Sequence, residues 1–173
     1  MSYHIYTTPS LVLRARPLKE ADRVYILLTR DLGLIRASAT GVRKEVSKLR
    51  PALEPFSLTR VSLVKGKEHW RITSAILEEN LSQSLRGKEG LLVLARVFSL
   101  LEKLIRGESA NQELFDSVEK AIRHYNPEDD MFEMRLVAQV LFHLGYLEEA
   151  SLSLDKKPLV KAINEGLIAS GLV

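Results

Sequence analysis

Apolar residues recur at every second position over short runs in the first part of the chain, a pattern typical of β-strands. Residues 11–16 alternate in this way, so Val12, Arg14 and Arg16 are expected to share one face of a strand. Four further strand-like segments follow, at residues 24–29, 34–42, 56–64 and 69–77. Turn residues are expected at 31–33 and 65–68. Five short strands joined mostly by tight turns favour a small closed or partly open barrel.

From residue 85 onward the apolar positions follow a helical period instead. The pattern predicts helices over residues 89–106, 113–125 and 158–170. It also predicts a long helix that begins at Pro127, because proline suits the first turn of a helix, and that stops at Gly145. The acidic run Glu128–Asp130 would then lie at the positive end of that helix's dipole.

The change of period near residues 80–87 divides the chain into two expected domains of an α+β protein. Residues 1–80 are expected to form a five-stranded β-barrel, and residues 81–173 an all-α helical-bundle domain. The charge divides at the same place, because 14 Lys and Arg against 8 Asp and Glu give the first part +6, whereas 11 against 14 give the second −3. A positively charged barrel suits a polyanion such as nucleic acid, although the same side chains could form an ordinary solvated surface.

The composition restricts the class of protein further. Hydrophobic residues make up 46% of the chain and charged residues 27%, which is ordinary for a globular protein. There is no apolar run of roughly 18 residues, so neither a membrane span nor a membrane partner is expected. The N-terminal residues lack the basic and apolar regions of a secretion signal, and we expect a cytoplasmic protein. The absence of cysteine excludes disulfides, thiolate zinc sites and cysteine nucleophiles.

Several segments of the barrel region together resemble one known family. They are Glu20–Arg23, Leu27–Thr29, Gly33–Leu34, Gly41–Arg43 and Ser47–Phe56. In this spacing they resemble the N-terminal domain of RecO, the family of bacterial DNA-repair and recombination-mediator proteins. Residues 131–136 and 144–147 are similar to the helical part of the same family. The resemblance covers nearly the whole chain, densely to about residue 77 and thinly between residues 85 and 125.

The resemblance implies an N-terminal OB-fold, a small barrel that commonly binds oligonucleotides, followed by a C-terminal helical domain. It implies binding of single- and double-stranded DNA, promotion of strand annealing, and help in loading the RecA recombinase together with RecR. It also implies that the helical domain binds the acidic C-terminal tail of the single-stranded DNA-binding protein. Neither enzymatic activity nor a cofactor is expected.

The chain departs from the family pattern in one respect. Many members carry a four-cysteine zinc site after the segment that corresponds to Gly145–Leu147, and further helices follow it. This chain has Glu148–Leu152 at that place and no cysteine anywhere. We therefore expect a short form that lacks the zinc module and any metal, with a shortened helical domain.

Cations are concentrated in residues 14–56, where ten Lys and Arg stand against five Asp and Glu. A cation that contacts a phosphate releases condensed counterions and so strengthens binding. Seven residues are expected to contact DNA, three on strand faces and four on the flexible loop that precedes the fourth strand: Arg14, Arg16, Arg36, Arg43, Lys44, Lys48 and Arg50. Arg14 could instead pair with Glu20 or Asp22, and the loop residues could simply be solvated.

Aromatic and catalytic groups give a weaker signal. The aromatic residues of the expected strands are Tyr25, Phe56 and Trp70, and we expect Phe56 and Trp70 in the core. Binding should therefore depend on the phosphate backbone more than on base stacking. The four histidines have neither ligand nor triad spacing, and no glycine-rich phosphate-binding motif occurs.

Two other functions remain open from the sequence. The first is a protein-interaction adaptor whose barrel has weak DNA affinity, and the second is an OB-fold RNA-binding factor. Salt-dependent DNA binding would separate the mediator from the adaptor, whereas a preference for structured RNA would favour the RNA-binding factor. The helical segments also carry five cations that could flank an acidic tail or form ordinary surface charge: Arg96, Lys103, Arg106, Arg123 and Arg135.

Overall fold

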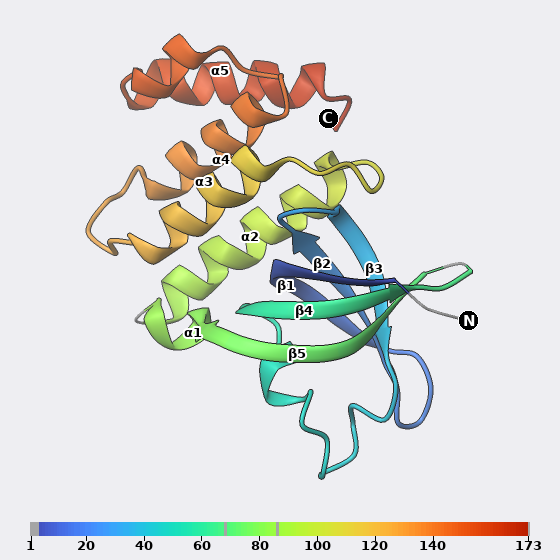
Figure 1. The fold of residues 1–173 in the computed structure, drawn as a ribbon. Coiled ribbons are helices and arrows are strands. Elements are labelled where there is room, and N and C mark those ends of the chain that lie inside the picture. Colours follow the sequence, from blue (N-terminus) through green and yellow to red (C-terminus); the bar gives the residue numbers. More distant parts are fainter. Residues whose placement is uncertain (1–3, 68, 86, 173) are drawn as a thin grey trace. The chain divides into compact units, whose positions relative to one another are not determined.

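The computed structural model describes residues 4–67, 69–85 and 87–172. The chain forms two compact units (Figure 1). The first comprises Met1–Ser84 together with Gly107–Ala110, and the second comprises Leu85–Arg106 and Asn111–Val173. The turn expected at 65–68 includes Glu68, which lies outside the described residues.

Five strands of the first unit close into a barrel in the order β1-β2-β3-β5-β4 (Figure 1). The strands are β1 (Ile5–Pro17), β2 (Arg23–Thr29), β3 (Gly33–Ala39), β4 (Ser57–Lys65) and β5 (Trp70–Asn80). Neighbouring strands pair antiparallel except β3 and β5, which are parallel, and β1 closes the barrel against β4. The five-stranded OB-fold barrel expected from the sequence is confirmed.

A bulge in β1 corrects the expected alternation of its side chains. Val12 pairs with Leu27 and Arg14 pairs with Ile26, so Leu13 is an extra residue between two successive pairs. Val12 therefore lies in the barrel core, whereas Arg14 belongs to the opposite face. The prediction that Val12 shares a face with the two arginines is wrong, because strict alternation holds only for an unbulged strand.

The barrel core consists of apolar side chains from all five strands. Its fully buried members include Val12, Tyr25, Leu27, Ile35 and Leu63. Burial raises the pKa of the Tyr25 phenol above its ordinary value of 10.0, and the nearby Arg23 opposes the shift. Trp70 also lies in this core with 3% of its surface exposed, as expected.

The segment between β3 and β4, residues 40–56, is anchored at both ends and is not a free loop. Val42 and Leu53 are buried in the barrel core, and Leu53 belongs to a short 3-10 helix, η1 (Pro51–Leu53). The backbone N–H of Gly41 donates to Asp22 Oδ1 at 2.8 Å. Phe56 is half-buried, has φ 67° and directly precedes β4. It is therefore not a strand residue, and it does not belong to the core cluster, so both predictions for this residue are wrong.

Glycine is required at the turn between β2 and β3. Gly33 has φ 74°, a left-handed conformation that side chains with a Cβ rarely adopt. A Cβ there would also collide with the backbone of Ser109. The Gly107–Ala110 segment therefore packs against this turn inside the first unit.

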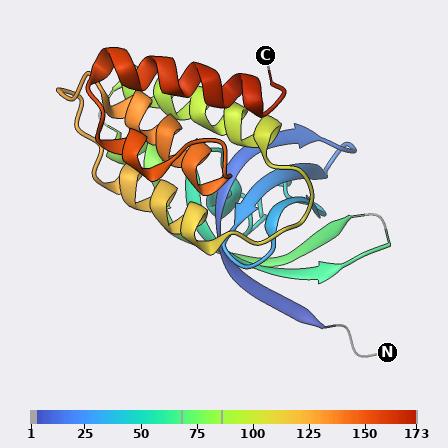
Figure 2. The same cartoon turned by 90° about the horizontal axis from the view of Figure 1, so that it is seen from above.

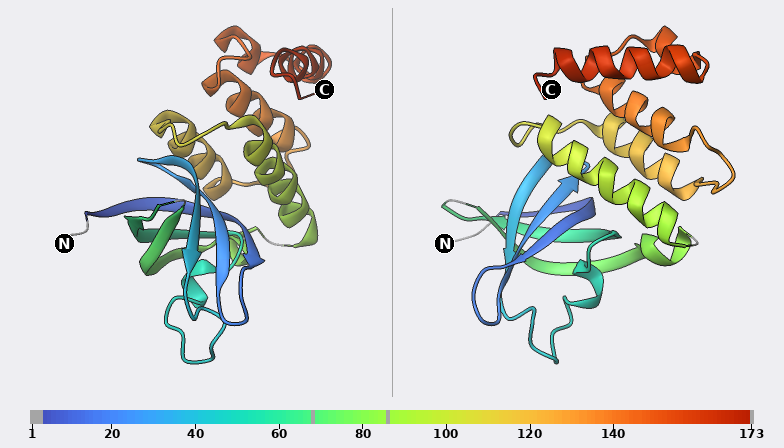
Figure 3. Two further views of the ribbon diagram at one scale, coloured as in Figure 1. Left: turned by 90° about the vertical axis from the view of Figure 1, so that its right-hand side faces the viewer. Right: turned by 180° about the vertical axis from the view of Figure 1, so that it is seen from behind.

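The second unit consists of helices, which Figures 2 and 3 show from three further directions. They are α2 (Lys88–Leu104), α3 (Gln112–Arg123), α4 (Phe132–His143), the 3-10 helix η2 (Glu149–Ser153) and α5 (Lys156–Ala169). A further short helix, α1 (Leu81–Ser84), belongs to the first unit. Helix α4 contacts α2, α3 and α5, and its buried face includes Leu136, Val140 and Leu141.

The start of α4 differs from the prediction. The helix begins at Phe132 and not at Pro127, because Asn126 caps a separate turn by accepting the N–H of Glu128. Asp129 accepts the N–H of Met131 at 3.0 Å, so it lies at the entry to the helix. The acidic run therefore precedes α4, and the acid in the first turn of the helix is Glu133.

Asp130 of the same acidic run has a partner of its own. It forms a 2.6 Å ion pair with Lys156, and this hydrogen bond lowers the pKa of its carboxyl group. No helix in the described part of the chain is long and apolar enough to cross a bilayer.

Candidate nucleic-acid interface

Cross-strand pairing places two of the predicted arginines in one row on the barrel. Ile26 of β2 pairs with Arg14 of β1 on one side and with Arg36 of β3 on the other. Residues that are paired across a sheet share a face, and the neighbouring Tyr25 and Ile35 point into the core. Both arginines therefore belong to the outer face of the barrel.

A second row runs beside the first. Arg16 pairs with Val24, Val24 pairs with Ser38, and Ser38 pairs with Arg71 across the parallel β3–β5 contact. This row adds a cation from β5 that the sequence analysis did not select. We define the basic face as the four arginines of the two rows: Arg14, Arg16, Arg36 and Arg71.

Three members of the basic face are available to a ligand. Arg16, Arg36 and Arg71 are exposed, and Arg14 is half-buried. Among the residues that the structure describes, Arg16, Arg36 and Arg71 have no carboxylate partner. Unneutralised cations on the outside of the barrel attract a polyanion such as a phosphate backbone.

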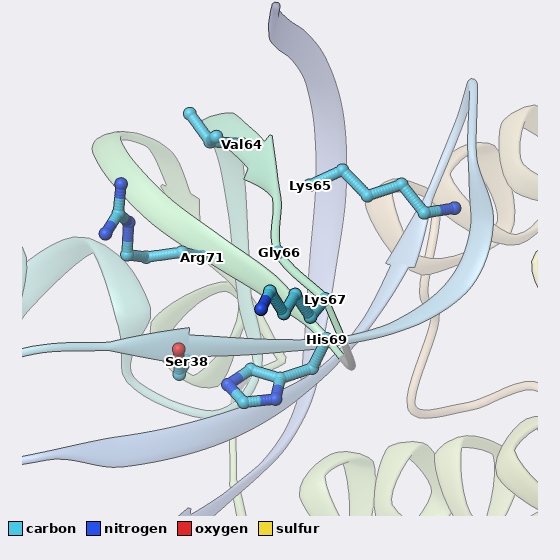
Figure 4. Close-up of a pocket in the computed structure, with 7 residues that line it drawn as sticks. All are labelled: Ser38, Val64, Lys65, Gly66, Lys67, His69 and Arg71. Carbon is cyan, nitrogen blue, oxygen red and sulfur yellow. The ribbon is translucent and has the colours of Figure 1, made fainter. Parts of the chain in front are cut away.

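A groove at the turn between β4 and β5 extends this face. Its volume is about 670 Å³, and its lining includes Ser38, Lys67, His69 and Arg71. Figure 4 shows the side chains of Lys67, His69 and Ser38 gathered on one side of the hairpin. Lys65 also lines the groove, but its side chain extends away from that group (Figure 4).

Lys65 already has an anionic partner. Its Nζ lies 3.1 Å from a carboxylate oxygen of Glu108, in the Gly107–Ala110 segment of the same unit. Its Nζ also lies 5.0 Å from the centroid of the Trp70 ring, close enough for a cation–π contact. The groove therefore has Lys67 and Arg71 as cations with no carboxylate partner among the described residues.

The four predicted loop cations lie on the anchored segment between β3 and β4. All four are exposed: Arg43, Lys44, Lys48 and Arg50. Arg50 shares Glu54 with Arg23, at 3.9 Å from each, so it is partly neutralised.

One aromatic residue of the barrel that the sequence analysis did not consider is partly exposed. Tyr25 and Trp70 are buried, but Tyr6 in β1 is 36% exposed and contacts Trp70 edge to face, with ring centroids 5.2 Å apart. The exposed His4 contacts Tyr6 in turn, at 4.4 Å. The sequence analysis missed this group because it began the first strand at Leu11 and not at Ile5.

In the second unit, three of the five cations considered for an acidic tail pair with acids. Arg96 makes two 2.6 Å contacts with Glu133, which raise the pKa of its guanidinium. Two further pairs join Arg123 to Glu119 and Arg135 to Asp129, at 3.0 and 2.9 Å. No group of three or more His, Asp or Glu in the described part of the chain is placed to hold a metal ion.

Comparisons with known proteins agree with the topology and the resemblance. The family model described as "Recombination protein O N terminal" matches residues 1–80. A relative from Heliobacterium modesticaldum, named DNA repair protein RecO, is 32% identical over 167 residues, which are 94% of this chain and 59% of the relative.

Relatives with the same name occur in other bacteria. The protein from Dehalococcoides mccartyi is 36% identical over 115 residues, or 65% of this chain and 44% of the relative. That from Synechococcus sp. is 45% identical over 67 residues, or 39% and 24%. The chain thus spans about three fifths, or less, of the length of these relatives. The match of residues 1–80 to the family's N-terminal domain and the relatives along the chain place this protein in the RecO family.

Proposed function

We propose that this protein is a DNA repair and recombination mediator whose barrel binds the DNA backbone through the basic face and the adjoining groove. The observation that carries the proposal is the register of β1, β2, β3 and β5, which aligns four arginines on the outer face of the barrel. Three of them are exposed and have no carboxylate partner among the described residues. Relatives named DNA repair protein RecO support the same role.

The segment between β3 and β4, residues 40–56, extends the proposed contact surface, and we call it the basic loop. Its cations Arg43, Lys44 and Lys48 have no carboxylate partner within the described residues, and the buried Val42 and Leu53 fix the ends of the segment that carries them. A charged surface held by a rigid barrel binds a polyanion with less loss of conformational entropy than a free loop does. Contacts from the arginines of the basic face to phosphates do not depend on base identity, so we expect weak sequence selectivity.

The finer activities follow from membership of the family and are part of the proposal. They are binding of both single- and double-stranded DNA, annealing of complementary strands, and help in loading the RecA recombinase together with RecR and the single-stranded DNA-binding protein. These activities need no bond to be made or broken by the protein. We therefore propose a non-enzymatic role in which the barrel holds phosphate backbones.

The test compares two variants that lose the same charge. In one, Arg16, Arg36 and Arg71 of the basic face become Gln. In the control, three exposed cations of the second unit become Gln: Lys103, Lys120 and Lys157. Fluorescence anisotropy of labelled single-stranded and duplex DNA would be measured across a salt series.

The basic-face variant should flatten the salt dependence. Each lost phosphate contact reduces the slope of log K against log salt by about 0.7 for a single strand, so three lost contacts reduce it by about 2. The control should change the slope by much less, because only long-range attraction is lost. Equal slopes for the two variants would refute the assignment of the basic face, and no DNA binding by the folded wild-type chain at low salt would refute the mediator function.

A further inference from the structure

The exposed aromatic group at the start of β1 has no role in backbone binding. Tyr6 lies between His4 and Trp70, and each pair of rings meets edge to face, at 4.4 and 5.2 Å between centroids. Tyr6 is 36% exposed and His4 is exposed, whereas Trp70 is buried at 3%. Figure 2 shows that the start of β1 and the β4–β5 hairpin both project from the barrel.

The Tyr6 ring is held in place before any ligand arrives. Its backbone pairs with Leu63 in the β1–β4 ladder, and its ring is braced by Trp70, which is itself fixed in the core. An aromatic side chain that is already ordered loses little conformational entropy on binding. The exposed part of the ring is therefore a preformed apolar surface on an otherwise charged end of the barrel.

The aromatic group shares its side of the β4–β5 hairpin with Lys65. Tyr6 pairs with Leu63 and Lys65 pairs with Trp70 on the core side of the strands, whereas Arg71 pairs with Val64 on the outer side. Lys65 lines the groove, and its Nζ lies 5.0 Å from the ring of Trp70, which contacts Tyr6. Lys67 and Arg71 of the same groove lie on the other side of the hairpin (Figure 4), so Lys65 is the cation on the side of the ring. Phosphate-binding cations beside an exposed aromatic ring are the combination that proteins use to bind single-stranded nucleic acid.

We propose that Tyr6, braced by Trp70 and flanked by His4, is a stacking site for an unpaired base of single-stranded DNA whose phosphates contact Lys65 and the other cations of the β4–β5 hairpin. The proposal rests on the proposed function and adds a residue that distinguishes single-stranded from duplex DNA. A base in a duplex is stacked between its neighbours and has no free face, so duplex DNA uses the cations alone. The stacking contact is tolerant of sequence, because every base has a π-face.

The experiment separates the base from the backbone. A labelled thymine oligonucleotide and an abasic backbone of the same length would be titrated against the wild-type chain and against the variants Tyr6→Leu and Tyr6→Phe. Leucine keeps an apolar contact with Trp70 but has no aromatic face, whereas phenylalanine keeps the ring. Duplex DNA serves as a ligand with no free base. Thermal unfolding of each variant would establish that the barrel is intact.

Wild type should bind the thymine oligonucleotide about 5- to 150-fold more tightly than the abasic backbone, the range expected for one base–aromatic stack. Tyr6→Leu should remove this difference without changing the affinity for the abasic backbone or for duplex DNA, and Tyr6→Phe should keep it. Trp70 is the single tryptophan of the chain, so its fluorescence should also change when the thymine oligonucleotide binds and much less in Tyr6→Leu.

Equal affinities of wild type and Tyr6→Leu for the thymine oligonucleotide, with strong salt-dependent binding retained, would overturn the stacking site and leave the proposed function intact. An equal loss of affinity for all three ligands in Tyr6→Leu would also overturn it, because a stacking residue acts only on the base. Absence of DNA binding by the folded wild-type chain would instead overturn the proposed function on which this site rests.

Discussion

Replacing Leu53 by alanine should destabilise the first unit, because this residue joins the basic loop to the barrel core. Leu53 is fully buried in the same cluster as Trp70 and Leu27. The substitution removes three carbons, and at about 0.8 kcal/mol for each buried carbon the transfer term is about 2.4 kcal/mol. The cavity left behind adds to this, so a loss of about 3 to 4 kcal/mol in the free energy of unfolding is expected.

Trp70 makes the measurement specific for this unit. It is the only tryptophan in the chain and belongs to the barrel core, so its fluorescence in a urea titration follows barrel unfolding. With an m-value of about 1 kcal/mol per molar urea, typical for a small domain, the midpoint should fall by about 3 M. Circular dichroism of the helices should show a second transition that the substitution leaves in place.

A matched control lies in the same loop. Val46 is 86% exposed, so Val46→Ala should change the free energy of unfolding by less than about 0.5 kcal/mol. If Leu53→Ala shifted the Trp70 transition no more than Val46→Ala does, the loop would not be anchored in the core. The reasoning that its cations are held in place for a ligand would then fail.

Two further predictions concern single charges. Because burial raises the pKa of Tyr25, the folded protein keeps the phenol proton while the unfolded chain releases it, so the free energy of unfolding should fall as the pH rises above about 10. Tyr25→Phe should reduce this fall in the free energy of unfolding, measured by urea titrations at several pH values. If wild type and Tyr25→Phe showed the same fall, the assignment of this pH dependence to Tyr25 would be contradicted. Glu108→Gln should release Lys65 and raise the DNA affinity about two- to fivefold at low salt, in line with the value of an exposed ion pair. The gain should disappear at high salt, and an unchanged affinity at low salt would show that this pair does not compete with DNA.

The five strands could be predicted from the sequence because the signals are local. Alternation of apolar residues and turn residues identified every strand of the barrel to within a few positions, apart from the early start of β1 at Ile5. These local signals do not predict the bulge at Leu13. An extra residue on one strand is specified by its pairing with β2, and the sequence of β1 alone does not show that pairing.

Three members of the basic face could likewise be predicted from local sequence signals, and the fourth could not. Arg14, Arg16 and Arg36 lie on strands whose positions were predicted, and antiparallel neighbours in sequence are the commonest pairing. Arg71 was missed because it joins the face only through the parallel contact between β3 and β5. That contact joins residues more than thirty positions apart and leaves no local pattern.

The error at the start of α4 has a different cause. Proline fits the first turn of a helix, but it fits a turn outside a helix equally well. Asn126, the residue before Pro127, accepts the N–H of Glu128 and closes a turn there, so the helix begins only at Phe132. The sequence contains both signals, and their relative strength depends on the packing of the helices.

Separate contacts for phosphate and base would give the protein a means of releasing its product. In the proposed function the basic face and groove would attract any DNA strand, whereas Tyr6 would add affinity only for an unpaired base. When two bound strands anneal, their bases pair and the stacking contact is lost, but the phosphate contacts remain. The duplex would then be held less tightly than the strands from which it formed, by the affinity that Tyr6 contributed. A protein with the cations alone would bind its product at least as tightly as its substrates. Tyr6→Leu should therefore leave the dissociation rate of duplex unchanged and raise that of single strands, so that duplex product inhibits an annealing assay with limiting protein more strongly than it does with wild type.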